Sequence, residues 1–429
     1  MSGSMDRRDF LRASAAAGVA AGLAEAATAA EAPKAIRLGV IGTGGRGTYL
    51  LGVALGLGAE VPALCDIHEG RLGNACGVVE KARGRRPEGY SRGPTDYRRL
   101  LTRDDLDAVL VTTPMQLHAV MAMDALRAGK AVLSEVAAAM TLEECWGLVR
   151  AAEETGKLYM LSENCCYYQQ NLMILNMVAK GVFGPMTFAE CGYVHDCRSL
   201  LFQGDGSLTW RGEMARDNNA NVYPTHSLGP VAQWLGINRG DRLVSLVAAA
   251  TPPAALHDYA AKRFPEGNPA RQVRFKLGDS TSTLIRTAKG AVIDLRFDMC
   301  SPRPVVSTTY YTLQGLRASY ESAGQRIWID GRSAGHAWEP VAKYAAEFEH
   351  PAWAKWEQEA KKAGHSGGDF FVIQQFLDAI RAGGPPPIDA ADAAAWSAII
   401  PLSAKSLAEG GAPQEIPDFT RGKWESRKA

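Results

Sequence analysis

The segment Tyr223-Pro224-Thr225-His226 brings a phenol and an imidazole close together along the chain. Histidine changes its charge near neutral pH, and either side chain can exchange a proton with a bound molecule. Tyr223 and His226 are therefore candidates for general acid–base chemistry. The alternative is a structured turn in which His226 only starts a helix, since special turn chemistry is common in proteins.

A glycine-rich loop indicates a second kind of chemistry, the binding of a dinucleotide. Residues 36–41 predict a buried parallel strand, which leads into Gly42-Thr43-Gly44-Gly45-Arg46-Gly47 and then into an apolar helix over residues 49–57. The glycines allow a tight turn and a close approach of the backbone to a pyrophosphate, while the helix N-terminus offers unpaired N–H groups. The flanking strand and helix make the motif specific, because the glycine pattern alone is weak.

An acidic residue stands where the cofactor ribose is expected. A second strand over residues 61–65 ends at Asp66, at about the ~20-residue offset where a carboxylate binds the adenosine ribose hydroxyls. Asp66 therefore favours NAD over NADP. A solvated carboxylate at a strand end is the alternative interpretation.

The alternation of strand and helix continues to residue 161 and predicts a Rossmann domain. Strands are expected over 108–112, 131–134 and 158–161, and helices over 118–128 and 141–155, the second opened by a capping box from Thr141 to Glu144. Ligands of such sheets bind at the carboxyl ends of the strands. The side chains just past those ends can reach a cofactor: Thr113, His118, Glu135 and Asn164. For His118, a histidine that only starts a helix is an equal alternative.

The second half of the chain has a different pattern. Polar and apolar residues alternate over 186–194, 280–287 and 291–299, and the last two segments flank the turn Ala288-Lys289-Gly290, as in an antiparallel sheet. Helices are expected over 169–180 and over 369–382, where apolar residues recur at helical spacing before Gly383. We therefore predict an α/β Rossmann domain followed by an α+β domain with a mostly antiparallel sheet.

The N-terminus has Arg7 and Arg8 ahead of a run with almost no charge that is rich in alanine and glycine. This pattern predicts a twin-arginine export signal, and hence a periplasmic or extracellular protein. A membrane anchor is the alternative, but the run is weakly apolar. The predicted domains are the signal over 1–32, the Rossmann domain over 33–163 and the α+β domain over 164–429, with C-terminal helices packing back toward the Rossmann domain.

Composition limits the class of partner. The chain has 429 residues with 47 basic and 46 acidic side chains, so no strong field directs it to nucleic acid or to an anionic membrane. We expect a small, uncharged partner and no stable membrane insertion after processing, and homo-oligomerisation stays open. The eight cysteines have no C-x-x-C spacing and the histidines no H-x-x-x-H motif, so we predict buried thiols and no metal site, while one disulfide stays open.

Three longer motifs resemble one family. From residue 36 onward the chain is similar to the Gfo/Idh/MocA oxidoreductases, which join a Rossmann domain to an open-faced sheet domain. More narrowly, it resembles glycoside hydrolase family 109, the NAD-dependent α-N-acetylgalactosaminidases. Their motifs E-N-C-C-Y, H-D-x-R and Y-P-T-H-x-L-G-P are present as Glu163 to Tyr167, His195-Asp196-Cys197-Arg198 and Tyr223 to Pro230.

The resemblance implies a set of residues for each ligand. Beside Gly42 and Gly44 of the glycine loop, the residues implied in NAD binding are Arg46, Gly47, Asp66, Met115, Gln116, Leu117, His118, Glu135, Val136, Asn164 and Tyr223. Those implied in sugar binding are Tyr193, Arg211, Tyr223, Pro224, Thr225 and His226. Within that set, His226 is implied as a base and Tyr223 as its partner.

One departure from the parent dehydrogenases bears on how the cofactor is used. Their E-K-P motif supplies a proton-shuttling lysine, whereas this chain reads Glu135-Val136-Ala137 and has no carboxylate flanking His226 in the usual dehydrogenase arrangement. The resemblance implies oxidation at C3 of the sugar, loss of the acidified C2 proton, elimination of the leaving group, addition of water and return of the hydride. We expect the NAD to be tightly bound and recycled, since free cofactor is scarce outside the cytoplasm.

The sugar itself is less sharply defined. Val305 stands where members of the family place a tyrosine at the sugar site, and a lost hydroxyl changes sugar selection. An α-N-acetylgalactosaminide or a related glycoside is expected. Two other functions stay open: an NAD-dependent sugar or inositol dehydrogenase, which the missing lysine disfavours, and a non-catalytic sugar-binding sensor.

Overall fold

The first half of the chain contains a parallel sheet. The structure is a computed structural model that describes residues 35–304 and 308–427, so the predicted export signal and Val305 lie outside the described residues. Six parallel strands follow the order β3-β2-β1-β4-β5-β6. Their bounds are β1 (Arg37–Ile41), β2 (Glu60–Cys65), β3 (Glu88–Tyr90), β4 (Ala108–Val111), β5 (Ala131–Ser134) and β6 (Tyr159–Leu161). The strand order reverses between β1 and β4, where Rossmann sheets bind their ligands.

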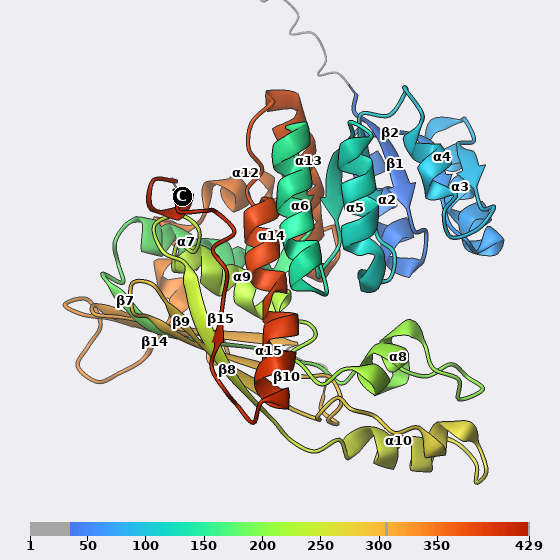
Figure 1. Cartoon of the computed structure of the whole chain (residues 1–429). Coiled ribbons are helices and arrows are strands. Elements are labelled where there is room, and N and C mark those ends of the chain that lie inside the picture. Colours follow the sequence, from blue (N-terminus) through green and yellow to red (C-terminus); the bar gives the residue numbers. More distant parts are fainter. Residues whose placement is uncertain (1–34, 305–307, 428–429) are drawn as a thin grey trace, which may run out of the picture. The chain divides into compact units, whose positions relative to one another are not determined.

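Helices cover the faces of this sheet, which is why β4 and β5 are buried along their whole length. They are α2 (Gly45–Gly56), α3 (Glu69–Arg83), α4 (Tyr97–Leu101), α5 (His118–Arg127) and α6 (Leu142–Thr155), and α5 and α6 lie side by side (Figure 1). The capping box predicted for α6 is confirmed, because the Thr141 hydroxyl accepts from the Glu144 N–H and the Glu144 carboxylate accepts from the Thr141 N–H. The Rossmann fold expected from the sequence is therefore present.

A second sheet of nine strands follows in the order β14-β13-β12-β11-β7-β10-β9-β8-β15. Only the pair of β7 and β10 is parallel, so the sheet is mostly antiparallel, as predicted. Residues of β9 alternate between buried and exposed, the pattern of a sheet with one covered face. The strands are β7 (Met186–Val194), β8 (Leu243–Ala250), β9 (Thr281–Thr287), β10 (Val292–Asp298), β11 (Thr309–Gly315), β12 (Ala318–Glu321), β13 (Arg326–Ile329), β14 (Glu339–Pro340) and β15 (Gln414–Glu415).

The helices of the second half connect the two sheets. Helix α9 packs on β7 and β11, while α13 packs against α2 and α14 packs against α6 and β6. Residues from Ile36 onward therefore form one unit. These helices are α7 (Gln169–Ala179), α8 (Trp210–Asp217), α9 (Thr225–Trp234), α10 (Ala255–Arg263), α11 (Ala345–Phe348), α12 (Pro351–Ala360), α13 (Gly368–Ala382), α14 (Ala390–Ser397) and α15 (Ile399–Ala408).

Two further features bear on the predictions from composition. All eight cysteines lie in the described part of the chain, and each is a buried free thiol, as expected. Among the described residues, the helices are too short or too polar for any of them to cross a bilayer.

Candidate active site

The glycine loop between β1 and α2 leaves open space where a pyrophosphate is expected. Gly42 has a positive φ of 92°, and a Cβ at Gly47 would lie 2.0 Å from the carbonyl oxygen of Gly42. By contrast, no heavy atom lies within 4 Å of the place a Cβ would take at Gly44 or Gly45. No side chain caps the first turn of α2. An uncapped helix N-terminus below open space suits an anionic pyrophosphate.

Asp66 lies directly after β2, beside the glycine loop. Its Oδ2 accepts a hydrogen bond from the Thr43 N–H at 2.7 Å, and its Oδ1 accepts one from the His68 N–H at 2.8 Å. These bonds hold the carboxylate against the loop. Oδ2 also accepts from the Thr43 hydroxyl at 3.2 Å, whereas Oδ1 can accept a further hydrogen bond, so the group fits a ribose hydroxyl of NAD.

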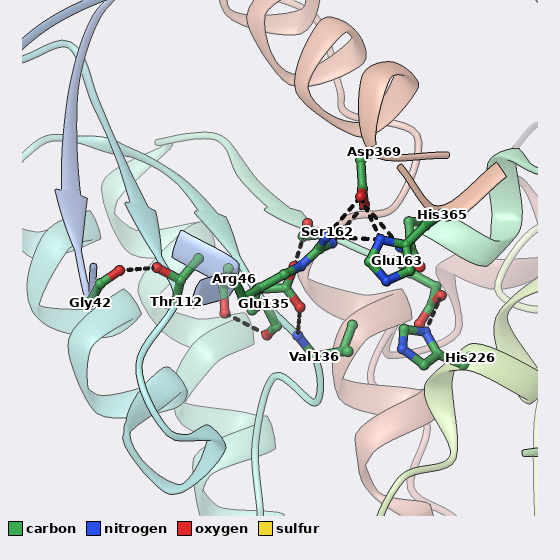
Figure 2. Close-up of polar contacts among 12 residues, drawn as sticks. Gly42, Arg46, Thr112, Glu135, Val136, Ser162, Glu163, His226, His365 and Asp369 are labelled. Atoms are coloured by element: carbon green, nitrogen blue, oxygen red, sulfur yellow. Dashed lines mark hydrogen bonds and ion pairs between the residues drawn. The ribbon is translucent and has the colours of Figure 1, made fainter. Parts of the chain in front are cut away.

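Arg46 joins the glycine loop to two carboxylates (Figure 2). Its Nε donates to Glu135 Oε1 at 2.8 Å, and its Nη1 and Nη2 donate to the two oxygens of Asp369 at 2.8 and 2.7 Å. Asp369, whose side chain is fully buried, also accepts from Asn164 Nδ2 at 2.9 Å. Bidentate arginine–carboxylate pairs are both strong and directional. Arg46 therefore ties the loop to the end of β5 and to the start of α13.

Arg46 and Asp369 stay charged because their ion pairs and hydrogen bonds outweigh the cost of burying each charge. Burial alone would raise the pKa of Asp369, but hydrogen bonds from His365 and Arg46 hold it well below its ordinary value. Burial would likewise lower the pKa of Arg46, but the charges of Glu135 and Asp369 raise it. Since protein carboxylates already bind the Arg46 guanidinium, its contact with NAD stays a prediction.

His118 is a fully buried side chain at the start of α5. Its Nδ1 lies 2.8 Å from the carbonyl oxygen of Ala137, and its Nε2 lies 2.7 Å from that of Thr113. Burial lowers the pKa of this histidine. The ring links the loop after β4 to the loop after β5, so its contacts are those of a structural residue. The neighbouring Met115, Gln116 and Leu117 form a short 3-10 helix ahead of it.

His226 is held by a carboxylate that is remote in sequence. Its Nδ1 lies 2.7 Å from Oε1 of Glu163, whose side chain is fully buried (Figure 2). Glu163 follows β6, and the same oxygen accepts from the Cys165 N–H at 3.0 Å. Burial alone would lower the pKa of His226, but the charge of Glu163 raises it well above its ordinary value. The sequence has no carboxylate flanking His226 in the usual dehydrogenase arrangement, but the fold supplies one from another segment.

Two tyrosine rings lie beside this histidine. The centroid of the Tyr223 ring lies 4.9 Å from that of His226 and 5.1 Å from that of Tyr193. The Tyr193 hydroxyl lies 2.7 Å from Nδ1 of His195. Burial raises the pKa of Tyr223, and the charge of Glu135 adds to that effect while His226 and Arg211 oppose it. The structure thus brings Tyr193, Tyr223 and His226 together.

The remaining predicted sugar residues lie around these rings. The guanidinium of Arg211 stacks over the Trp210 ring at 4.1 Å on α8, and its charge acts on Tyr223. Pro224 is the N-cap of α9, and His226 lies in its first turn. Thr225 is buried, and its hydroxyl has no hydrogen-bond partner within the described chain.

Sequence reasoning missed three residues of this site: Glu163, Asp369 and His195. Glu163 could have been suspected, since it precedes Asn164 in a motif already singled out. Asp369 offered no signal beyond its place at the start of an amphipathic helix.

Tyr311 holds the backbone of His226 in place, because its hydroxyl donates to the carbonyl oxygen of His226 at 2.7 Å.

Sequence comparisons agree with the geometry. A family described as "Glycosyl hydrolase 109, C-terminal domain" matches residues 167–426, and one described as "Oxidoreductase family, NAD-binding Rossmann fold" matches residues 36–163. Residues 4–24 match the twin-arginine translocation signal sequence, so the chain is exported by that pathway, as predicted.

Full-length relatives and solved structures point the same way. A "Glycosyl hydrolase family 109 protein" of Solibacter usitatus is 39% identical, and an "Alpha-N-acetylgalactosaminidase" of Tannerella forsythia is 36% identical, with 98% of both chains covered in each case. A solved levoglucosan dehydrogenase in complex with NADH has a TM-score of 0.70 at 17% identity, covering 90% of this chain and 100% of that one. That likeness concerns the fold.

Proposed function

Because this chain belongs to glycosyl hydrolase family 109 and is an NAD-dependent glycosidase, we propose that it cleaves α-N-acetylgalactosaminides or closely related glycosides with one NAD retained through each cycle. The name of the Tannerella forsythia relative supports this sugar. The observation that carries the proposal is the support of His226 by the buried Glu163, next to the rings of Tyr193 and Tyr223.

The cofactor and the protein divide the chemistry between them. The chemistry supplied by bound NAD is a reversible oxidation at C3 of the sugar, which acidifies the hydrogen on C2 and allows elimination of the glycosidic oxygen. The protein has to position the sugar, move protons and exclude other reactions. A pair of carboxylates flanking the glycosidic bond is not needed for this route.

His226 acts as the base through its Nε2 atom when the ring is neutral, and the charge of Glu163 makes that neutral ring a stronger base because it raises the pKa. A carboxylate accepts but does not donate hydrogen bonds, so Glu163 keeps a proton on Nδ1 and leaves Nε2 for the substrate. When Nε2 takes a proton, the buried carboxylate stabilises the imidazolium that forms. This is the role that an aspartate plays for the histidine of a serine protease triad.

The surrounding side chains hold the sugar. Tyr223 exchanges protons with the substrate alongside His226, and it lies within the electrostatic reach of both Glu135 and Arg211. Tyr193 and Arg211 bind sugar hydroxyls. Tyr193 keeps its orientation through the hydrogen bond to His195, and Arg211 keeps its orientation by stacking on Trp210.

NAD is held by the glycine loop and by the Arg46 cluster. Asp66 binds the ribose, and the open first turn of α2 binds the pyrophosphate. The ion pairs of Arg46 with Glu135 and Asp369 attach this loop to the end of β5 and to α13, so the loop cannot open without breaking two partly buried ion pairs. We therefore expect bound NAD to dissociate slowly. A redox-neutral cycle does not require bound NAD to exchange with free cofactor.

The test is hydrolysis of a panel of aryl glycosides in deuterated water. We expect the α-N-acetylgalactosaminide to be cleaved fastest and the released sugar to carry deuterium at C2. Deuterium at C2 supports the oxidation route if the free sugar gains none in the same solvent without the enzyme. Hydrolysis that leaves no deuterium at C2 would overturn the route. Saturable sugar binding without turnover would favour a sensor instead.

A further inference from the structure

We propose that Glu163, Cys165 and His226 form a binding site for a divalent cation of the Zn²⁺ type. One ligand atom from each residue lies within 4.8 Å of the others. Carboxylate oxygen, thiolate sulfur and imidazole nitrogen are the ligands that zinc takes in proteins. The sequence did not predict this site, because Glu163 and His226 come from segments that only the fold brings together.

The three ligand atoms are near enough to one another to share a zinc ion after the side chains adjust. Zinc binds sulfur at about 2.3 Å and imidazole nitrogen at about 2.0–2.1 Å. Tetrahedral bonds of these lengths place neighbouring ligand atoms a little more than about 3 Å apart. Glu163 Oε1 and His226 Nδ1 now share a proton at 2.7 Å. The cation would replace that proton, and small movements of the side chains would open the space.

The buried carboxylate provides a second, independent indication. Both oxygens of Glu163 belong to a side chain with 0% exposure, but Oε2 has no hydrogen-bond partner within the described chain. A buried carboxylate oxygen without a partner is costly. A cation between Glu163 and Cys165 can be bound by this oxygen as well.

The exchange also balances the charge of the site. With a neutral His226, the carboxylate gives the site one negative charge beside a neutral thiol. Binding of the dication releases the thiol proton to solvent and leaves the imidazole proton on Nε2. A dication with a carboxylate, a thiolate and a neutral imidazole then sums to zero, so the buried site carries no net charge after binding.

The experiment adds Co²⁺ to the metal-free chain with its NAD and records the thiolate-to-cobalt absorption in the near ultraviolet. We expect saturation at one Co²⁺ per chain and loss of the band when Zn²⁺ is added. Cys165→Ser should abolish the band, whereas Cys166→Ser, a change at the adjacent buried thiol, should keep it. Glu163→Gln should lower the affinity for Co²⁺ by more than the roughly 10–100-fold that loss of an outer-shell partner costs.

No band in the parent chain, or a band that persists in Cys165→Ser, would overturn the site. So would equal weakening in Cys165→Ser and Cys166→Ser. Near-ultraviolet circular dichroism and NAD content establish that each variant is folded. One consequence rests on the proposed function: zinc on Nδ1 breaks the hydrogen bond between His226 and Glu163 and should stop turnover. If cobalt binds as expected but turnover continues, the site stands and the role given to His226 is wrong.

Discussion

Glu163 and His226 are 63 residues apart in the chain, and the structure places Oε1 of the first 2.7 Å from Nδ1 of the second. Glu163 follows a strand of the parallel sheet, and His226 lies in the first turn of α9, which packs on the second sheet. His226 thus lies where the two halves of the chain meet. Its partner Glu163 comes from the half that carries the glycine loop.

Glu163→Gln tests this pair directly. The amide can donate to Nδ1 and so favours the wrong tautomer of His226, while the shape of the side chain is kept. We expect kcat to fall by roughly 10²–10⁴-fold, the usual range for loss of general acid–base assistance, with KM and NAD content nearly unchanged. Glu163→Asp should recover part of the activity. Full activity in Glu163→Gln would show that His226 needs no carboxylate.

Gly229→Ala tests how closely α9 must approach Glu163. A Cβ at this position would lie 3.0 Å from Glu163 Cγ, 3.0 Å from Cys166 Sγ and 3.1 Å from Trp396 Cζ3. We expect a loss of about 1–3 kcal/mol in the free energy of unfolding from overpacking, together with reduced kcat. The contradicting result is an unchanged kcat in a destabilised variant, since Glu163 would then have kept its place.

Tyr193→Phe removes only a hydroxyl from the predicted sugar site. Loss of one hydrogen bond of about 1 kcal/mol predicts a rise in KM of roughly fivefold. Tyr310→Phe is the matched control, because Tyr310 packs over Gly192 on the opposite face of the sheet. Steady-state kinetics with an aryl glycoside should separate the two variants, and equal KM values would remove Tyr193 from the sugar site.

Asp369→Asn tests the Arg46 cluster through its dependence on pH. The folded pKa of Asp369 lies below its ordinary value, so its contribution to stability is present above about pH 4 and is lost as the pH falls toward the folded pKa. We expect the variant to lose about 2–3 kcal/mol at pH 7, less than the roughly 3–5 kcal/mol of a fully buried pair because Arg46 is partly exposed. The difference from the parent chain should shrink in acid. Urea titrations at several pH values measure this, and a constant difference would argue against the ion pair.

Gly47→Ala and Gly52→Ala form a pair that tests the nucleotide loop. Both glycines lie in α2, but a Cβ at Gly47 would meet the Gly42 carbonyl, whereas Gly52 has no atom within 4 Å. We expect Gly47→Ala to purify with little NAD and to lose about 1–3 kcal/mol of stability, while Gly52→Ala keeps NAD and gains up to about 1 kcal/mol. NAD released on denaturation is the measurement. Equal NAD content in both variants would contradict the tight-turn role of Gly47.

Much of the fold could be predicted because its signals are local. The capping box at Thr141, the turn at Gly290 between β9 and β10 and the end of α13 before Gly383 depend on residues a few positions apart. The strand before and the helix after the glycine loop likewise identified the dinucleotide fold. Where a pattern extends over one turn or one hairpin, the chain expresses it without help from distant segments.

The candidate site could be predicted only in part. Tyr223 and His226 lie in one short motif, so the sequence by itself identified them as a pair, along with the glycine loop and the export signal. Tertiary structure alone decided that Glu163 supports His226, that Asp369 binds Arg46 and that the ring of His118 lies between two carbonyl oxygens. The physical reason is that these contacts join segments that approach only when the sheets and α13 pack, and burial then makes each hydrogen bond costly to leave unmade.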